Sequence, residues 1–152
     1  MKFDSLGIRF EYPDNWTLDE EEALAGNRAV TVYSPGGGAF WSVCVHPRSA
    51  DPKSLAQAAT DAMKEEYDSL EAEWIEETVA NQALVGYDLN FYCLDLTSTA
   101  AVRSLRTPLG TYTMFWQAED REFAQFCDVF LAMTVSLLRG LDEPADRAAP
   151  TD

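Results

Sequence analysis

Gly7-Ile8-Arg9-Phe10-Glu11-Tyr12-Pro13-Asp14-Asn15-Trp16 is the stretch of sequence that most clearly indicates the fold. From residue 8 to residue 12, apolar side chains alternate with polar ones, which is the period of a strand with one face on a core. Residues 13–15 have the composition of a turn, and residues 16–18 fit a second short strand. The segment therefore predicts two short strands joined by a proline turn.

Further strands are predicted on either side of a central helical stretch. In the first half they cover residues 28–34 and 39–46, and Pro35-Gly36-Gly37-Gly38 between them fits a hairpin turn. In the second half they cover residues 74–79, 85–96, 102–107 and 111–118, with turn residues at Asn81, Gly86 and 108–110 and a softer break at 97–99.

Two amphipathic helices complete the pattern. The first begins at Asp51-Pro52, an N-cap followed by a proline in the first turn, and its apolar residues recur at helical spacing as far as residue 70. The second begins at Glu119-Asp120, carries its apolar stripe over residues 123–138 and ends at Gly140. Because strands with short connections pair antiparallel and each helix must bury one face, we expect an α+β fold with helices packed on a central antiparallel sheet.

Three motifs resemble a known superfamily. They are Phe10-Glu11-Tyr12-Pro13-x-x-Trp16, Ala83-Leu84-Val85-Gly86-Tyr87 at the entry to a long strand, and the closing helix over residues 123–138. On these motifs the chain resembles a bacterial member of the PsbP/DcrB-like superfamily, which has the Mog/PsbP-like fold. The resemblance covers residues 3–141 as one domain. It implies an α/β/α sandwich flanked by two main helices, and proteins that bind other proteins rather than catalyse reactions. The composition of residues 142–152 predicts a disordered acidic tail.

The composition limits the kinds of partner. The chain has 152 residues, of which 47% are hydrophobic, enough for one core. It carries 26 acidic and 11 basic residues, a formal net charge of -15. Because phosphate contacts need clustered Lys and Arg, this balance argues against nucleic acid or an anionic membrane as the partner. We expect another protein, basic or apolar, although the same charge also keeps a protein soluble.

The N-terminus and the thiols predict a cytoplasmic protein. Residues 1–7 lack the apolar region of a secretory signal. The longest apolar run, residues 129–138, is shorter than the roughly 20 residues that span a bilayer, so no membrane span is expected. Cys44, Cys93 and Cys127 are odd in number and lie in apolar stretches, which fits reduced, buried thiols better than disulfides.

The residues that carry catalysis are scarce. His46 is the only histidine, which excludes a metal site with two histidines. A catalytic pair of Cys44 as nucleophile and His46 as base is still possible by residue count. These two residues lie on one face of a strand that ends at Pro47, so we favour a structural role for both. Gly36 to Gly38 lead into a strand and not into the helix that a phosphate-binding loop needs. We therefore expect no enzyme and no catalytic, metal or cofactor site.

Acidic clusters are the strongest polar signal. One cluster is Asp19-Glu20-Glu21-Glu22, and the other lies around the end of the first helix and consists of Asp61, Glu65, Glu66, Asp68, Glu71, Glu73, Glu76 and Glu77. Neither cluster has the alternating oxygen ligands and central glycine of a calcium loop. Solvated loops and faces account for most of these carboxylates, and the alternative is a docking surface for a basic partner. The candidate partner surface consists of Asp19, Glu20, Glu21 and Glu22, with Glu65 and Asp68 near the end of the first helix.

Aromatic side chains are frequent in the predicted strands, and Trp16, Trp41, Trp74 and Trp116 are among them. Core packing accounts for most of them, and the rest would line a groove for an apolar ligand or a partner's helix. The leading hypothesis is a non-enzymatic protein-binding module that acts as an adaptor or chaperone-like partner. The alternative is a small apolar-ligand binding protein with an aromatic pocket.

Overall fold

The computed structural model describes residues 1–141, and it contains a seven-stranded sheet, a two-stranded sheet and three helices. The strands are β1 (Lys2–Ser5), β2 (Ile8–Glu11), β3 (Thr17–Asp19), β4 (Ala29–Tyr33), β5 (Phe40–His46), β6 (Glu71–Val79), β7 (Gln82–Cys93), β8 (Leu96–Thr107) and β9 (Gly110–Glu119). The helices are α1 (Glu21–Leu24), α2 (Pro52–Glu66) and α3 (Asp120–Leu141). The predicted acidic tail, residues 142–152, lies outside the described residues.

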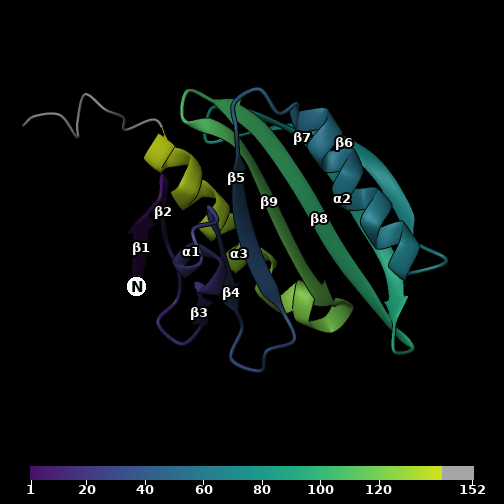
Figure 1. The fold of residues 1–152 in the computed structure, drawn as a ribbon. Helices are drawn as coiled ribbons and strands as arrows, with labels where there is room; N and C mark the ends of the chain where they lie inside the picture. Colours follow the sequence, from purple (N-terminus) through teal and green to yellow (C-terminus); the bar gives the residue numbers. More distant parts are fainter. Residues whose placement is uncertain (142–152) are drawn as a thin grey trace, which may run out of the picture.

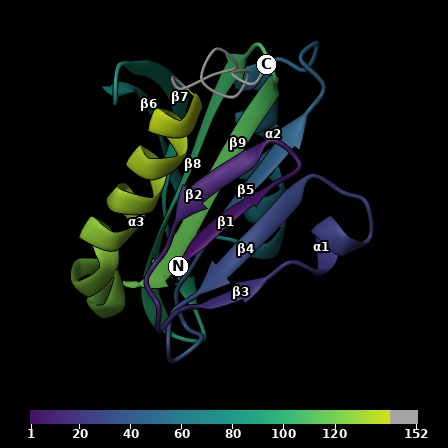
Figure 2. The ribbon, with the colours of Figure 1, turned by 90° about the vertical axis from the view of Figure 1, so that its left-hand side faces the viewer.

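The large sheet is antiparallel throughout, in the order β3-β4-β5-β9-β8-β7-β6. Helix α3 and the hairpin β1–β2 cover one face, and α2 packs on the other face over β7, β8 and β9 (Figures 1 and 2). This arrangement confirms the α/β/α sandwich with a central antiparallel sheet and two main helices.

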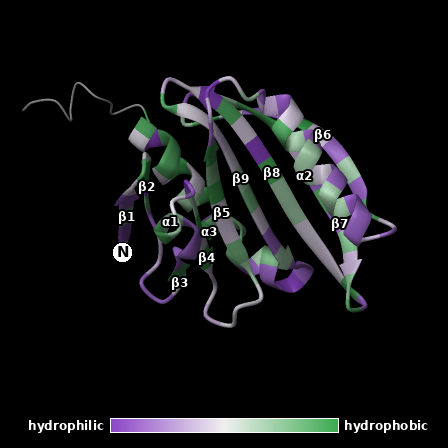
Figure 3. Ribbon diagram, in the orientation of Figure 1, coloured by the Kyte–Doolittle hydropathy of each residue, from purple (hydrophilic) through white to green (hydrophobic). Residues whose placement is uncertain are grey.

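The main core lies between the sheet and the layer formed by α3 and β1–β2. Strand β5 buries alternate residues, Trp41, Val43 and Val45, against this layer, as the period of a strand requires. Helix α3 contributes Phe130, Met133, Leu137 and Leu138 at helical spacing. The apolar segments of α3 and β5 stand out in Figure 3.

A smaller core lies under α2. Leu89, Phe91 and Ala100 of the sheet are buried there, with Met63 and Tyr67 packed on them. Helix α2 begins as predicted, because the Asp51 side chain accepts a hydrogen bond from the Ser54 N–H at 2.9 Å and Pro52 occupies the first turn.

Two local elements were not predicted. Strand β1 pairs with β2 from Lys2↔Glu11 to Ser5↔Ile8, and Phe3 alone gives it a buried side chain, too weak a pattern to detect in the sequence. The acidic run at residues 19–22, whose like charges favour a loop in the sequence, instead leads into the single helical turn α1, Glu21–Leu24. The Asp19 carboxylate accepts a hydrogen bond from the Glu21 N–H at 3.0 Å, which stabilises the start of this turn.

Two predicted breaks in the strands were wrong. The turn between β7 and β8 lies at Leu94 and Asp95, both at positive φ, and residues 97–99 belong to β8. Gly86 does not interrupt a strand but lies inside β7, opposite Arg103 of β8. A Cβ at Gly86 would lie 1.8 Å from the Val102 carbonyl oxygen, so glycine is needed for close approach of two backbones and not for a turn.

Candidate functional site

Helix α3 has an unusually apolar outer face. Between Glu122 and Arg139 its only charged side chain is Asp128. By length and composition alone, the helix is long and apolar enough to cross a membrane. Of its most apolar 18-residue window, 28% is buried inside the fold. The buried residues form one stripe in the core, several further apolar residues are half-buried, and Leu131 is the one large apolar side chain of α3 that is mostly exposed, at 52%.

A groove of about 340 Å³ runs along one side of α3, between the helix and strands β6 to β9. We call it the α3 groove. Its helix wall includes Phe123, Cys127 and Leu131, and Trp116 of β9 contributes an aromatic surface. Its sheet wall carries four charged side chains, those of Glu73, Glu77, Asp88 and Arg103, next to the apolar Val79, Leu84 and Ala101.

Arg103 organises the sheet wall of the α3 groove. Its Nε donates to Glu77 Oε2 at 2.5 Å, its Nη2 donates to Asp88 Oδ1 at 2.6 Å, and its Nη1 donates to the carbonyls of Tyr87 and Val102 at 3.1 Å. The guanidinium also lies 5.8 Å from the centre of the Trp116 ring, within cation–π range. The side chain of Arg103 is 6% exposed, whereas those of Glu77 and Asp88 are each 39% exposed. The groove therefore presents carboxylates to solvent and keeps its cation covered.

Glu73 and Glu77 belong to the acidic cluster noted around the end of the first helix, although neither was among the six predicted site residues, and Asp88 and Arg103 were not singled out at all. A usable signal existed, because Arg103 interrupts the apolar run Ala100-Ala101-Val102 and Asp88 interrupts the apolar pattern of β7. A charged residue in a buried strand usually has a partner. Arg103 has two, Asp88 from the β7–β8 hairpin and Glu77 from β6.

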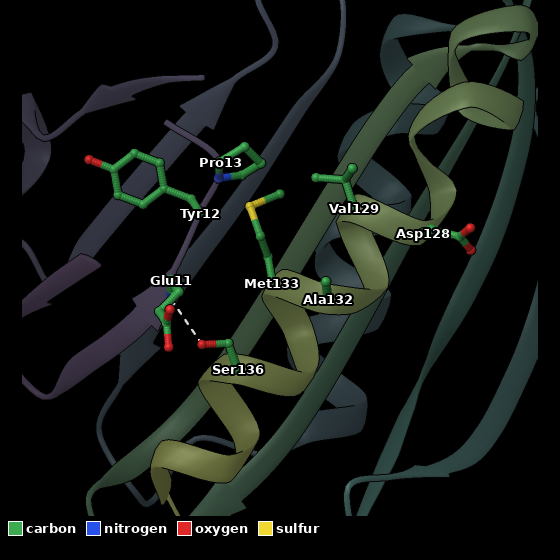
Figure 4. A pocket seen from close by; sticks show the side chains of 8 residues that line it. All are labelled: Glu11, Tyr12, Pro13, Asp128, Val129, Ala132, Met133 and Ser136. Atoms are coloured by element: carbon green, nitrogen blue, oxygen red, sulfur yellow. Dashed lines mark hydrogen bonds between the residues drawn. The ribbon is translucent and has the colours of Figure 1, made fainter. Parts of the chain in front are cut away.

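A second, more open hollow of about 450 Å³ lies on the other side of α3, against the end of β2. Figure 4 shows Met133 and Val129 of α3 on one side and Pro13 on the other. The backbone N–H of Glu11 donates to Ser136 Oγ at 2.9 Å and closes one end of the hollow. This hollow has few groups that could select a ligand, and it extends the apolar outer face of α3.

The predicted partner surface falls into two separate places. Glu21 and Glu22 belong to α1, which packs beside β4, while Glu65 lies at the end of α2, over the other half of the sheet (Figure 1). Two of its members also have local structural roles: Asp19 stabilises the start of α1, and Glu22 Oε1 accepts a hydrogen bond from Asn27 Nδ2 at 2.9 Å. A partner surface built from all six residues remains a prediction.

The remaining predicted candidates have ordinary surroundings. Cys44 and His46 are half-buried on the face of β5 that points away from α3. Burial raises the pKa of the Cys44 thiol, with a smaller contribution in the same direction from the Glu22 carboxylate. All three thiols are free, and Cys127 is exposed rather than buried as predicted. Within residues 1–141, no group of three or more His, Cys, Asp or Glu side chains is placed to hold a metal ion.

The aromatic residues divide between the core and the surface. Trp16 and Trp41 are buried, Trp116 lines the α3 groove, and Trp74 is exposed at the edge of the sheet. Tyr33, Phe40 and Phe115 form a half-buried row on the α2 side of the sheet, with ring centres 5.9 and 5.8 Å apart along the row.

Comparison with known proteins identifies the fold. No protein-family model matches the chain, and no curated protein matches it in sequence. Solved structures do match. Cyanobacterial PsbP from Synechocystis is 15% identical, with a TM-score of 0.54 over 90% of this chain and 89% of that one. The Ran-binding protein Mog1p of Saccharomyces cerevisiae is 12% identical, with a TM-score of 0.53 over 94% of this chain and 92% of that one.

A third match is PA94, a protein of unknown function from Pseudomonas aeruginosa. It is 10% identical, with a TM-score of 0.54 over 90% of this chain and 94% of that one. At such identities the likeness shows the fold alone, and it agrees with the resemblance noted in the sequence. The chain therefore has the PsbP/Mog1-like fold.

Proposed function

We propose that this protein is a non-enzymatic protein-binding module, an adaptor or chaperone-like partner, that docks through the outer face of α3. The observation that carries the proposal is the exposed apolar side chain of Leu131 beside the α3 groove, whose helix wall is apolar. Exposed apolar side chains next to a groove are typical of protein-interaction sites. Mog1p, which has the same fold, is a Ran-binding protein, so the fold is compatible with protein binding.

The chemistry of the described residues supports a binding role over a catalytic one. A cysteine nucleophile needs a lowered pKa, and burial raises that of Cys44. Arg103, the cation of the α3 groove, is held by two carboxylates and two carbonyls. A cytoplasmic location is part of the proposal, and three free thiols support it.

An affinity pull-down from native lysate tests the proposal when it is run with two matched variants. Leu131→Arg places a charge on the outer face of α3, and Leu24→Arg makes the same change on α1, where Leu24 is 78% exposed. We expect the unmodified protein and Leu24→Arg to retain a stoichiometric protein partner, identified by mass spectrometry, and Leu131→Arg to lose it. Recovery of no such partner, or equal recovery by Leu131→Arg, would overturn the proposal.

A small apolar-ligand binding protein is the second candidate. The aromatic rings of Trp116, Phe123 and Phe130 on the α3 groove favour it, and the volume of about 340 Å³ is within the range of ligand sites. The opposite wall carries three carboxylates, which an apolar ligand would leave without partners. A thermal-shift screen distinguishes the two candidates, because a ligand at a hundred times its Kd stabilises a fold by about 2.7 kcal/mol. No shift with any apolar compound would remove the second candidate.

A further inference from the structure

We infer that the α3 groove receives a basic, amphipathic segment of the protein partner, with a Lys or Arg side chain beside Glu73, Glu77 and Asp88 and an apolar side chain against Leu131. This inference rests on the proposed function and names the chemistry of the partner. It concerns a surface different from the acidic residues at positions 19–22, 65 and 68.

The charge of the groove selects a cation. Its lining contains three carboxylates, those of Glu73, Glu77 and Asp88, and one guanidinium, that of Arg103. Glu77 and Asp88 each use one oxygen to bind Arg103, and 39% of each side chain is still exposed. An additional cation would therefore meet unbalanced negative charge in a partly enclosed site, where charge pairs are screened less than on an open surface.

The same geometry disfavours an anionic ligand. Among residues 1–141, the one cation of the lining is Arg103, which is 6% exposed and directs its donors at groups of the protein itself. A phosphate or carboxylate ligand would have to displace Glu77 or Asp88 to reach it. Any anion would also face Glu73. The charge of the whole chain, -15, adds a long-range preference for basic partners.

The opposite wall selects an apolar group. Phe123, Cys127 and Leu131 line the groove from α3 without a charged side chain among them. A segment that carries basic residues on one side and apolar residues on the other can satisfy both walls at once. A free ammonium ion or a purely apolar ligand would satisfy only one of them, so a peptide segment fits the groove better than either.

Binding of two synthetic peptides tests the inference. One fluorescein-labelled peptide repeats Lys and Leu at helical spacing, and the other has Glu in place of every Lys. We expect anisotropy measurements to show binding of the Lys/Leu peptide only. We also expect saturating Lys/Leu peptide to slow alkylation of Cys127, because this exposed thiol lines the groove.

Two charge-reversal variants locate the contact. Glu73→Lys acts on the groove, and Asp4→Lys makes the same charge change on β1; both positions are exposed, and circular dichroism checks that both variants fold. We expect Glu73→Lys to weaken binding of the Lys/Leu peptide roughly tenfold or more and Asp4→Lys to change it less than threefold. Equal effects of the two variants, equal binding of both peptides, or unprotected Cys127 would each overturn the inference.

The outcomes distinguish failure of the basic-segment inference from failure of the proposed protein-binding function. If the Lys/Leu peptide does not bind while Leu131→Arg still loses the lysate partner, protein docking on α3 stands and the basic-segment inference alone is wrong. If the pull-down also recovers no partner, the proposed function is wrong as well.

Discussion

Trp41 Nε1 donates a hydrogen bond to Thr134 Oγ1 at 3.0 Å, and this bond joins strand β5 to helix α3 inside the main core. Both residues are almost completely buried. Thr134 in turn donates to the Phe130 carbonyl at 2.8 Å, so its hydroxyl serves as acceptor and donor at once. Since α3 also forms the proposed docking face, this bond positions the functional helix on the sheet.

Thr134→Val should reduce the free energy of unfolding by about 1–3 kcal/mol, because valine preserves the shape and leaves the buried indole N–H without an acceptor. Urea unfolding measures the change. Thr60→Val is the matched control: Thr60 is buried and its hydroxyl donates to the Ala56 carbonyl, within its own helix. We expect a distinctly smaller loss there, and equal losses would show that the Trp41 bond contributes nothing.

Gly86→Ala should destabilise the protein by about 3 kcal/mol or more, because the new methyl group would meet backbone atoms that cannot move independently. The atom nearest to it is the Val102 carbonyl oxygen, in the neighbouring strand β8. Gly36→Ala is the control, since a Cβ at Gly36 would meet no atom within 4 Å. Thermal unfolding compares the two, and a stable Gly86→Ala would contradict the packing described for β7 and β8.

The outcome at Gly86 shows why the fold was easier to predict than the site. Periodicity correctly indicated the long strands and both main helices, because it records which side chains are buried. Glycine, however, is ambiguous in a sequence: it can supply a turn or a close backbone approach, and only the β7–β8 register distinguishes them. The hairpin turn at Leu94 and Asp95 was missed because Leu94 is not a typical turn residue, so a real turn there has little signal in the sequence.

The α3 groove as a whole was not predicted, because its walls come from distant parts of the chain and the signals at Asp88 and Arg103 do not show which residues they meet. Asp88 and Arg103 are brought together by the β7–β8 hairpin, Glu77 by β6, and Leu131 by the packing of α3. Acidic clusters such as residues 19–22 and the one that contains Glu73 and Glu77 are conspicuous in a sequence, whereas the single charges of Asp88 and Arg103 that meet them in space are not. The sequence therefore indicated an acidic protein but not where its carboxylates face an apolar wall.

Cys44 should react slowly with iodoacetamide at neutral pH in the folded protein. Burial and the Glu22 carboxylate raise its pKa, which lowers the fraction of reactive thiolate. The exposed Cys127 should be alkylated first, and peptide mass spectrometry distinguishes the two sites. Glu22→Gln should modestly accelerate alkylation of Cys44, and in urea Cys44 and Cys127 should react at similar rates. Rapid labelling of Cys44 in the folded protein would revive the idea of a cysteine nucleophile.

The stability of the protein should fall as the pH rises above about 10. Burial raises the pKa of Tyr112 above its ordinary value of 10.0, with a smaller opposing effect of Arg28, and the hydroxyl donates to the Gly7 carbonyl. The folded state therefore favours the protonated phenol. Its contribution is fully present below the unfolded pKa and is lost as the pH rises through the folded pKa.

Tyr112→Phe removes both the hydrogen bond to the Gly7 carbonyl and the ionisable phenol, so comparison with the unmodified protein measures what the two contribute. At neutral pH the variant should lose about 0.5–1.5 kcal/mol, the usual contribution of one hydrogen bond. Above pH 10 the gap between the variant and the unmodified protein should narrow, because phenylalanine has no proton to lose. Tyr92→Phe is the control for removal of a phenol hydroxyl at an exposed position, since Tyr92 is 65% exposed. Urea unfolding across this pH range measures both variants, and a gap that stays constant would show that Tyr112 does not control the alkaline transition.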